Sequence, residues 1–287
     1  MTPTEHPATP ATGDIAWASW REDAAGRPLV LLHATGFHRH LWDAVVERLD
    51  HDGPVFAADT PGHGASPGSD NRDWIGTARA MLPWFDHVTA DREPALVAGH
   101  SFGGFVAMLF AAERPERVER LVMIDPVIPP RFTAEQLAAI ELSGFFTARR
   151  RNAFDSAEGF VETYASRDPY AGWEPRVLRD YAAHGLVPAD GGFKLACDPL
   201  TETSAYLGGV TEELAPYVAA VRAPVTVVRG RSGDRGQALD FSVSPTPPDL
   251  ASRFGRGRDM QWSDHTHFIP MEAPERIAAL LDEELGA

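Results

Sequence analysis

The residue with the clearest chemical potential in this 287-residue chain is Ser101. It lies in the pattern Gly99-x-Ser101-x-Gly103, between an apolar run at 95–98 and an apolar stretch rich in small residues at 102–112. This pattern predicts a strand that turns directly into a helix, with Ser101 on the sharp corner and glycines that let the backbone pass close to its neighbours. The helix would direct its first N–H groups to the same point, where they stabilise negative charge. A serine held in this way could act as a nucleophile beside an anion-binding site.

The elements around Ser101 predict an α/β fold. Apolar runs typical of strands buried on both faces alternate with stretches of helical periodicity. These runs lie at residues 28–32, 55–58, 95–98, 118–124 and 225–228. The alternation predicts a mostly parallel, doubly wound sheet with its site at the carboxyl ends of the strands. Thr35, Asp59, Ser101 and Asp125 follow such strands, so we expect them to cluster there.

Further patterns complete the prediction of the elements. Strands are expected at 14–20 and 260–262, and helices at 41–49, at 73–88 with an interruption near Pro83, at 248–254 and from Pro274 onward. Residues 1–13 are rich in Pro, Thr and Ala and predict a disordered tail. The core of the fold is expected at 14–129 and 217–287.

The pattern changes between the two parts of this core, and residues 130–216 predict an inserted helical cap without a strong strand. A Thr133-x-x-Gln136 capping box opens a helix that is expected to reach Phe146. Two more helices are expected at 157–165 and 174–184. Four aromatic residues of this segment are candidates for lining a pocket, although ordinary packing of the cap on the core explains each of them equally well: Phe145, Phe146, Tyr170 and Trp173.

Composition restricts the partners. The formal net charge of −15 argues against nucleic acid and anionic membranes as partners. No apolar run approaches the roughly 20 residues of a membrane helix, and the first residues do not resemble a signal peptide, so we expect a cytoplasmic protein. Cys197 is the only cysteine, which excludes an internal disulfide and a thiolate metal cluster. The sequence predicts no particular oligomeric state.

Four landmarks, in order, give the chain from residue 14 onward a resemblance to the α/β-hydrolase fold superfamily. They are His33-Ala34-Thr35-Gly36, Asp59-x-Pro61-Gly62-His63-Gly64-x-Ser66, Gly99-His100-Ser101-Phe102-Gly103-Gly104, and the stretch from His267 to Glu275. The first stands where the family has its oxyanion loop, the third matches the nucleophile elbow, and the last matches the loop of the catalytic histidine. Ala34 replaces a usual glycine, and only one strand is evident before Pro28 where the family commonly has two. The family uses no cofactor, so none is expected.

The resemblance implies roles for individual residues. Ser101 would be the nucleophile and His267 the base, with His265 as the alternative base. A carboxylate must orient the imidazole, and two positions are known in the superfamily, which correspond to Asp125 and Asp234. We favour Asp125, which directly ends its strand and matches lactone hydrolases among others.

Two further expectations concern the loops around the nucleophile. The backbone N–H groups of Thr35 and Phe102 would form the oxyanion hole. His33 and His100 are expected to hydrogen-bond to loop backbone near the site.

The implied function is that of a serine hydrolase acting on a small, apolar carboxylic ester or lactone through an acyl-enzyme. A serine nucleophile argues against the haloalkane dehalogenase and epoxide hydrolase branches, which use aspartate. Three alternatives stay open. They are hydrolysis of a carbon–carbon bond in a diketone-like substrate, a biosynthetic role in releasing or cyclising an acyl chain, and ligand binding with a silent triad.

Overall fold

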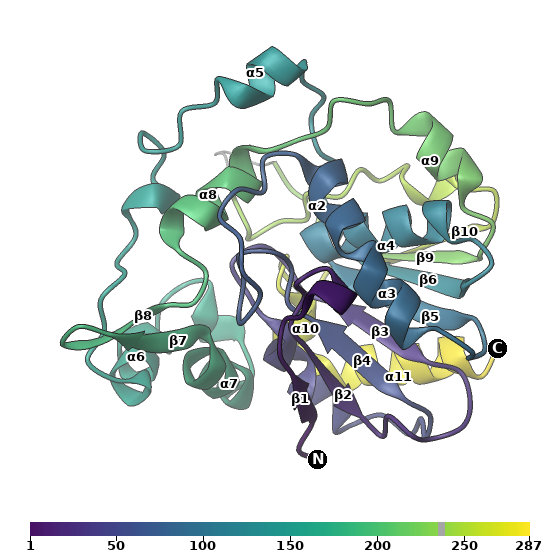
Figure 1. Ribbon diagram of the computed structural model, residues 1–287, viewed down its shortest axis with the longest axis horizontal. Helices are drawn as coiled ribbons and strands as arrows, with labels where there is room; N and C mark the ends of the chain where they lie inside the picture. The colour runs from purple at the N-terminus through teal and green to yellow at the C-terminus, as the bar shows by residue number, and fades with distance from the viewer. Residues whose placement is uncertain (235–238) are drawn as a thin grey trace.

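In the part of the chain described by the computed structural model, residues 1–234 and 239–287, the centre is an eight-stranded sheet (Figure 1). Its strand order is β1-β2-β4-β3-β5-β6-β9-β10. The strands are β1 Thr4–His6, β2 Trp17–Trp20, β3 Leu29–Leu32, β4 Val55–Ala58, β5 Ala95–His100, β6 Val118–Ile124, β9 Val225–Arg229 and β10 Gly257–Gln261. From β4 to β10 in this order all neighbours are parallel, whereas β2 is antiparallel to β4 and to β1. The predicted mostly parallel sheet is confirmed.

Helices cover both faces of this sheet. The α-helices of the described residues, including those of the segment between β6 and β9, are α1 Asp43–Val46, α2 Trp74–Ala80, α3 Leu82–Val88, α4 Phe102–Glu113, α5 Ala134–Ala138, α6 Ala157–Tyr164, α7 Pro175–Gly185, α8 Pro199–Leu207, α9 Ala215–Ala220, α10 Ile269–Glu272 and α11 Pro274–Leu285. The helix predicted at 73–88 is interrupted as expected, because α2 ends at Ala80 and Pro83 stands in the first turn of α3, where a missing N–H is tolerated. Among the described residues, no helix combines the length and apolar character needed to cross a bilayer.

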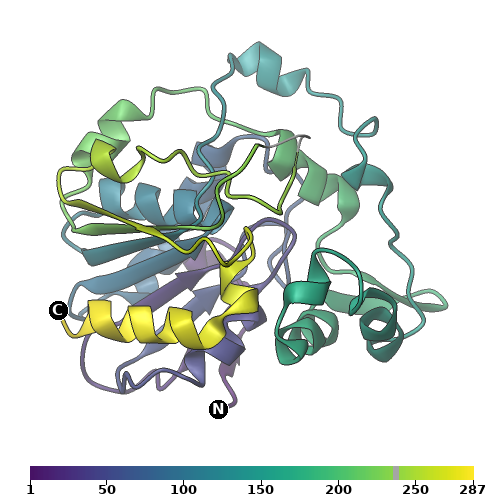
Figure 2. The same cartoon turned by 180° about the vertical axis from the view of Figure 1, so that it is seen from behind.

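Strand β3 illustrates why both faces are apolar. Successive side chains of a strand point to opposite faces. Leu29 and Leu31 therefore pack with residues of α1 and α11, whereas Val30 and Leu32 pack with residues of α2, α3 and α4. Figure 2 shows the yellow helix α11 lying across the face that is turned away in Figure 1. The two apolar layers hold the strand ends, and with them the candidate site residues, in a fixed arrangement.

The disordered tail expected at residues 1–13 is wrong. Strand β1 pairs with β2, and the His6 ring stacks on Trp17 with ring centroids 3.5 Å apart. Glu5 forms an ion pair with Arg39. These contacts come from residues distant in the sequence, so the Pro/Thr/Ala-rich composition did not reveal them. Strand β1 also supplies the second strand before Pro28 that was not evident in the sequence.

The chain between β6 and β9, called the inserted segment here, contains α5 to α9 and a hairpin of β7 Leu186–Ala189 and β8 Gly192–Leu195. Helices α6 and α7 and this hairpin form a lobe beside the sheet (Figures 1 and 2). Strands β7 and β8 are short and most of their residues are not buried, so neither is a strong buried strand. Two expectations are corrected. The helix from Thr133 ends at Ala138 instead of Phe146, and 248–254 holds only a 3₁₀ turn at Ala251–Arg253. In each case contacts with other elements decide the structure, since the local patterns are short.

Candidate active site

Ser101 occupies a strained corner between β5 and α4. Its backbone has φ 56° and ψ −116°, a region that non-glycine residues rarely adopt. The neighbouring glycines make this turn possible. A Cβ on Gly99 would lie 2.1 Å from the Gly103 carbonyl oxygen, and a Cβ on Gly103 would lie 2.3 Å from that of Leu32. The glycines of the pattern therefore allow close backbone approach, as expected for a strand that turns directly into a helix.

The structure brings Ser101, His267 and Asp125 into one hydrogen-bonded chain. His267 Nε2 lies 3.0 Å from Ser101 Oγ, and His267 Nδ1 lies 2.7 Å from Asp125 Oδ2. A carboxylate can only accept, so Nδ1 carries the proton and Nε2 keeps a lone pair for the serine hydroxyl. All three residues are buried. This is the tautomer in which an imidazole can take a proton from a serine.

The second oxygen of Asp125 has its own donors. Oδ1 accepts from the Gly230 N–H at 2.9 Å and from the Ser244 hydroxyl. The Thr246 hydroxyl donates to the Pro126 carbonyl oxygen at 2.8 Å and lies 3.3 Å from Asp125 Oδ1. Ser244 and Thr246 come from the loop after β9. Sequence reasoning missed both residues, because no motif marks them.

The two alternative acids occupy different environments. Asp125 is completely buried against His267, whereas the Asp234 side chain is exposed. The two alternative bases differ as well. His265 Nδ1 lies 3.3 Å from Glu272 Oε2, so this histidine belongs to a neighbouring polar contact, while His267 faces Ser101.

Two neighbours fix the position of His267. His100 Nε2 donates to the His267 carbonyl oxygen at 2.8 Å, and burial lowers the pKa of His100 well below its usual value. The Phe241 ring stacks on the His267 imidazole, with centroids 5.5 Å apart and an interplanar angle of 14°. The expected backbone hydrogen bond of His100 is therefore present, and a neutral imidazole makes it.

The loop after β3 is held through the Ala34 carbonyl. His33 Nδ1 donates to this oxygen at 2.7 Å and the Phe37 N–H at 3.2 Å, while His33 Nε2 accepts from the Thr60 N–H at 3.0 Å. Burial lowers the pKa of His33 to about 4, consistent with a neutral ring. In a trans peptide the C=O and the next N–H point in opposite directions. Holding the Ala34 carbonyl therefore also fixes the direction of the Thr35 N–H.

The two N–H groups expected to bind an oxyanion are available for it. Phe102 is the first residue of α4, so its N–H has no partner within the helix. Among the described residues, neither the Phe102 N–H nor the Thr35 N–H donates a hydrogen bond to a backbone carbonyl oxygen in a turn or loop. Asp59, also expected in the cluster, instead binds the Arg39 guanidinium and the backbone N–H groups of Arg39 and Ala65, which ties two loops together.

The inserted segment reaches the loop after β3 with polar groups. A Cβ on Gly36 would lie 2.7 Å from Glu202 Oε1, and φ at Gly36 is +82°. Glu202 Oε2 accepts from Arg150 Nη1 at 2.6 Å, and the Tyr181 hydroxyl donates to the Gly36 carbonyl oxygen at 3.4 Å. A partly buried ion pair therefore lies directly against the loop that carries Thr35.

Aromatic rings surround the same loop. The Phe37 ring makes edge contacts with Trp173, Tyr181 and Phe268, at centroid distances of 5.5, 5.4 and 6.0 Å. Tyr170 contacts Trp173 at 4.9 Å. This cluster joins the loop before the nucleophile to the residue that follows His267.

Of the other aromatic candidates, Phe146 lines a pocket of about 850 Å³, and the Phe145 ring packs at a tilt against the Phe146 ring, with centroids 4.7 Å apart. The pocket is also lined by Phe241 and Thr266, which lie next to His267.

Comparisons with known proteins identify the family. The model of the alpha/beta hydrolase family matches residues 29–280. The chain belongs to the alpha/beta hydrolase family. Among its relatives within the family, it is 42% identical over 101 residues to a pimeloyl-[acyl-carrier protein] methyl ester esterase from Nitrosomonas europaea. This stretch covers 34% of the chain and only 37% of that relative.

Two other similar proteins match this chain over most of their length. Lipase LipV from Mycobacterium tuberculosis is 24% identical over 263 residues, which cover 90% of this chain and 93% of the lipase. The crystal structure of E-2-(acetamidomethylene)succinate hydrolase superposes with a TM-score of 0.75 at 20% identity and covers all of both chains. At this identity the structural match shows the shared α/β-hydrolase fold.

Proposed function

We propose that this alpha/beta hydrolase is a serine hydrolase that cleaves a carboxylic ester or lactone through an acyl-enzyme. The observation that carries the proposal is the hydrogen-bonded chain from Asp125 through His267 to Ser101. The names of the esterase and lipase relatives support an ester as the substrate class.

In the proposed reaction, Ser101 Oγ attacks the carbonyl carbon while His267 Nε2 takes the hydroxyl proton. The negative oxygen that forms is bound by the N–H groups of Thr35 and Phe102, each worth about 3–4 kcal/mol of transition-state stabilisation. Collapse of this intermediate breaks the ester bond, and the leaving alkoxide takes the proton from His267. A water molecule then gives a proton to His267 and attacks the acyl group, which restores Ser101 and releases the carboxylic acid.

Asp125 has a supporting role in this scheme. Its carboxylate keeps the Nδ1 proton on His267 and stabilises the imidazolium that forms during attack. The backbone N–H of Gly230 and the hydroxyl of Ser244 both donate to Asp125 Oδ1, and these two hydrogen bonds hold the carboxylate in place. No cofactor takes part in the scheme.

Residues 130–216 would act as a cap that shapes the acyl pocket. The aromatic rings of Trp173 and Tyr181 provide an apolar wall next to Phe37. The pair of Arg150 and Glu202 adds one polar position to this wall. We therefore expect a substrate that is mainly apolar.

The test is labelling with a fluorophosphonate followed by mass spectrometry of the adduct, together with hydrolysis of a series of p-nitrophenyl esters. Wild-type protein should be labelled rapidly at Ser101 and should release p-nitrophenol in many turnovers. Ser101→Ala should do neither. Stoichiometric ligand binding without labelling or turnover would instead favour a binding protein with a silent triad, and turnover of a diketone but no ester would favour a carbon–carbon hydrolase.

A further inference from the structure

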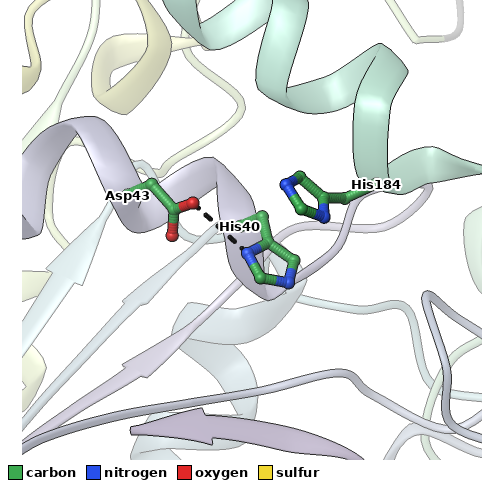
Figure 3. Close-up of side chains that lie close together, drawn as sticks. All are labelled: His40, Asp43 and His184. Carbon is green, nitrogen blue, oxygen red and sulfur yellow. Dashed lines mark hydrogen bonds and ion pairs between the residues drawn. The ribbon is translucent and has the colours of Figure 1, made fainter. Parts of the chain in front are cut away.

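A second cluster of chemically active side chains lies where α7 of the inserted segment meets the core (Figure 3). His40 belongs to the 3₁₀ turn Arg39–Trp42, Asp43 begins α1, and His184 lies in the last turn of α7. One ligand atom from each of the three lies within 4.8 Å of the others. His40 and Asp43 are buried, whereas His184 is exposed to solvent. The cluster therefore combines a buried base with a side open to the solution.

The contacts inside the cluster are close. His40 Nδ1 lies 3.3 Å from Asp43 Oδ2. The rings of His40 and His184 stack with centroids 3.8 Å apart. Two imidazoles and one carboxylate from two stretches of the chain, residues 39–46 and the end of α7, thus lie close together.

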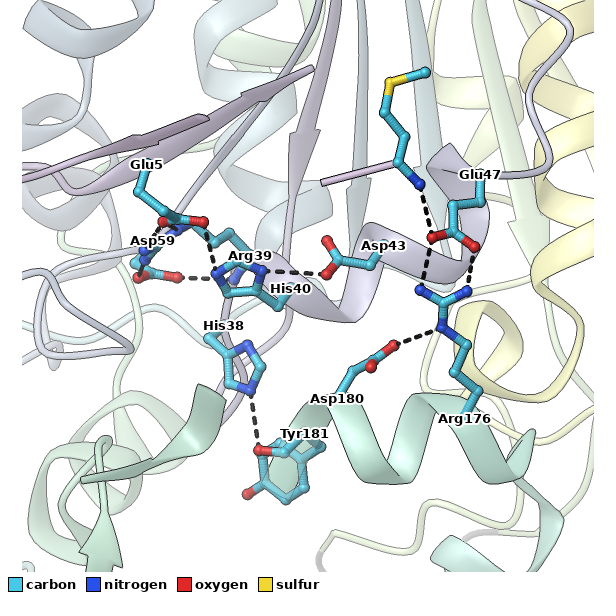
Figure 4. Close-up of polar contacts among 11 residues, drawn as sticks. Glu5, His38, Arg39, His40, Asp43, Glu47, Asp59, Arg176, Asp180 and Tyr181 are labelled. Atoms are coloured by element: carbon cyan, nitrogen blue, oxygen red, sulfur yellow. Dashed lines mark hydrogen bonds and ion pairs between the residues drawn. The ribbon is translucent and has the colours of Figure 1, made fainter. Parts of the chain in front are cut away.

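Unsatisfied buried atoms give a second, independent indication of a ligand. Asp43 is 9% exposed, and its Oδ1 has no hydrogen-bond partner among the described residues. His38 is 2% exposed and donates through Nε2 to the Tyr181 carbonyl oxygen at 3.2 Å, so its Nδ1 carries an unpaired lone pair. Figure 4 shows this second nitrogen on the side of the His38 ring that faces His40. Buried acceptors of this kind need a cation or a donor.

We propose that His40, Asp43 and His184 bind a divalent transition-metal ion such as Zn²⁺. Imidazole nitrogens suit zinc, cobalt, nickel and copper, whereas Mg²⁺ and Ca²⁺ prefer sites built from oxygen alone. Three protein ligands with a solvent-filled fourth position form a common zinc arrangement. The exposed side of the cluster at His184 provides that position and the path by which the ion enters.

The adjustment needed is a turn of the His184 ring out of its stack on His40, because the lone pairs of an imidazole lie in the plane of its ring. Ligand atoms around a tetrahedral zinc ion with bonds of 2.0–2.1 Å lie about 3.3 Å apart. The His40–Asp43 distance already has this value, so the remaining closure falls on His184, whose exposed ring can rotate.

The electrostatic surroundings favour a cation. The carboxylates of Glu5, Asp59 and Asp180 lie near Asp43 in Figure 4, where Glu5 Oε1 lies 3.3 Å from His40 Nε2 and Asp180 pairs with Arg176. The Arg39 guanidinium is held between Glu5 and Asp59 and is thereby neutralised.

A bound ion would tie the inserted segment to the core. His38 and His40 follow the loop that carries Thr35, and His184 belongs to α7. The same helix carries Tyr181, whose hydroxyl donates to the Gly36 carbonyl oxygen. The ion would therefore restrain α7 against the core in the neighbourhood of the candidate active site.

The test is isothermal titration of protein without an affinity tag, stripped with EDTA, against ZnCl₂, with MgCl₂ as a comparison. Wild type should bind one Zn²⁺ per chain and no Mg²⁺, and its melting temperature should rise with Zn²⁺ because the ion binds only the folded state. His184→Ala and Asp43→Asn should each weaken Zn²⁺ binding about tenfold or more. The exposed position of His184 and the equal size of Asn and Asp keep both variants folded, which circular dichroism without metal verifies.

The matched control is His87→Ala, which removes an exposed histidine from α3 and should leave Zn²⁺ affinity unchanged. A Co²⁺-loaded protein gives an independent measurement, since the ligand-field spectrum of wild type should be absent from His184→Ala. Zn²⁺ affinity that stays the same in both ligand variants, or titration without saturable binding, overturns the proposal.

Discussion

Asp125 and His267 are 142 positions apart in the chain, yet Asp125 Oδ2 and His267 Nδ1 lie 2.7 Å from each other. The parallel sheet makes this possible, because β6 and β9 are neighbours and the chain after β10 returns to the same edge. Asp125 ends β6 directly, with φ at +44°. The contact holds the His267 imidazole in the tautomer that can serve Ser101.

From this contact we predict that Asp125→Asn lowers kcat for a p-nitrophenyl ester about 10⁴-fold, because the amide favours the wrong tautomer of His267. Asp234→Asn is the matched control, and it should keep wild-type kcat because its side chain is exposed. Rates of fluorophosphonate labelling should follow the same order. Loss of activity in Asp234→Asn with retention in Asp125→Asn would assign the acid to the other position.

Ser244→Ala should reduce kcat/KM about 10- to 100-fold, since a hydrogen bond to a charged group is worth about 1.5–3 kcal/mol. The Ser244 hydroxyl donates to Asp125 Oδ1, so the effect should appear in kcat and in the pH profile, with little change in KM. Ser252→Ala removes an exposed hydroxyl bonded only to nearby backbone and should leave both constants unchanged. An equal rise in KM for Ser244→Ala would mean that the residue shapes the pocket instead.

Much of the sheet could be predicted because its signal is local. Strand β4 has the bounds that its apolar run indicated, Val55–Ala58, since strands buried on both faces need continuous apolar residues. Strand β6 also has the expected bounds, Val118–Ile124, although Glu119 and Arg120 interrupt the apolar residues at its start. Strand β1 and the hairpin of β7 and β8 contain few such residues. They are held by contacts with distant partners, which a single sequence does not display.

The residues of the candidate site also differ in whether a local sequence pattern marks them. The elbow around Ser101 and the loop of His267 could be recognised because their glycines and prolines serve local backbone geometry. No sequence pattern marks Ser244, because its contribution depends only on its hydrogen bond to the distant Asp125 carboxylate. The cluster of His40 and His184 was equally hidden, because α7 meets the core only in the folded chain.

The protein should lose stability in mild acid. Burial lowers the pKa of His33 to about 4 and that of His63 to about 3, from a usual 6.5. At pH values between the lowered pKa and 6.5, the unfolded chain binds more protons than the folded protein. The free energy of unfolding therefore has its full value above about pH 6.5 and decreases as the pH falls toward 4. At pH 5 the loss from His33 alone is about 2 kcal/mol.

Urea unfolding at pH 7.5 and pH 5 checks this expectation. In His33→Asn, which keeps a donor near the Ala34 carbonyl but does not titrate, the difference between the two pH values should shrink by about 2 kcal/mol. His87→Asn changes an exposed histidine and should leave the difference as it is in wild type. Equal differences in all three proteins would show that His33 does not contribute.

Glu202→Gln should lower the free energy of unfolding by about 3 kcal/mol, because it leaves the Arg150 guanidinium without its buried partner. The exposed pair Arg253–Asp249 offers the control, since Asp249→Asn should cost at most about 0.5 kcal/mol. Adding Arg150→Met to Glu202→Gln should restore part of the stability, as replacing both members of a buried pair is often nearly neutral. A double variant less stable than Glu202→Gln would mean that Arg150 contributes through packing rather than through its charge.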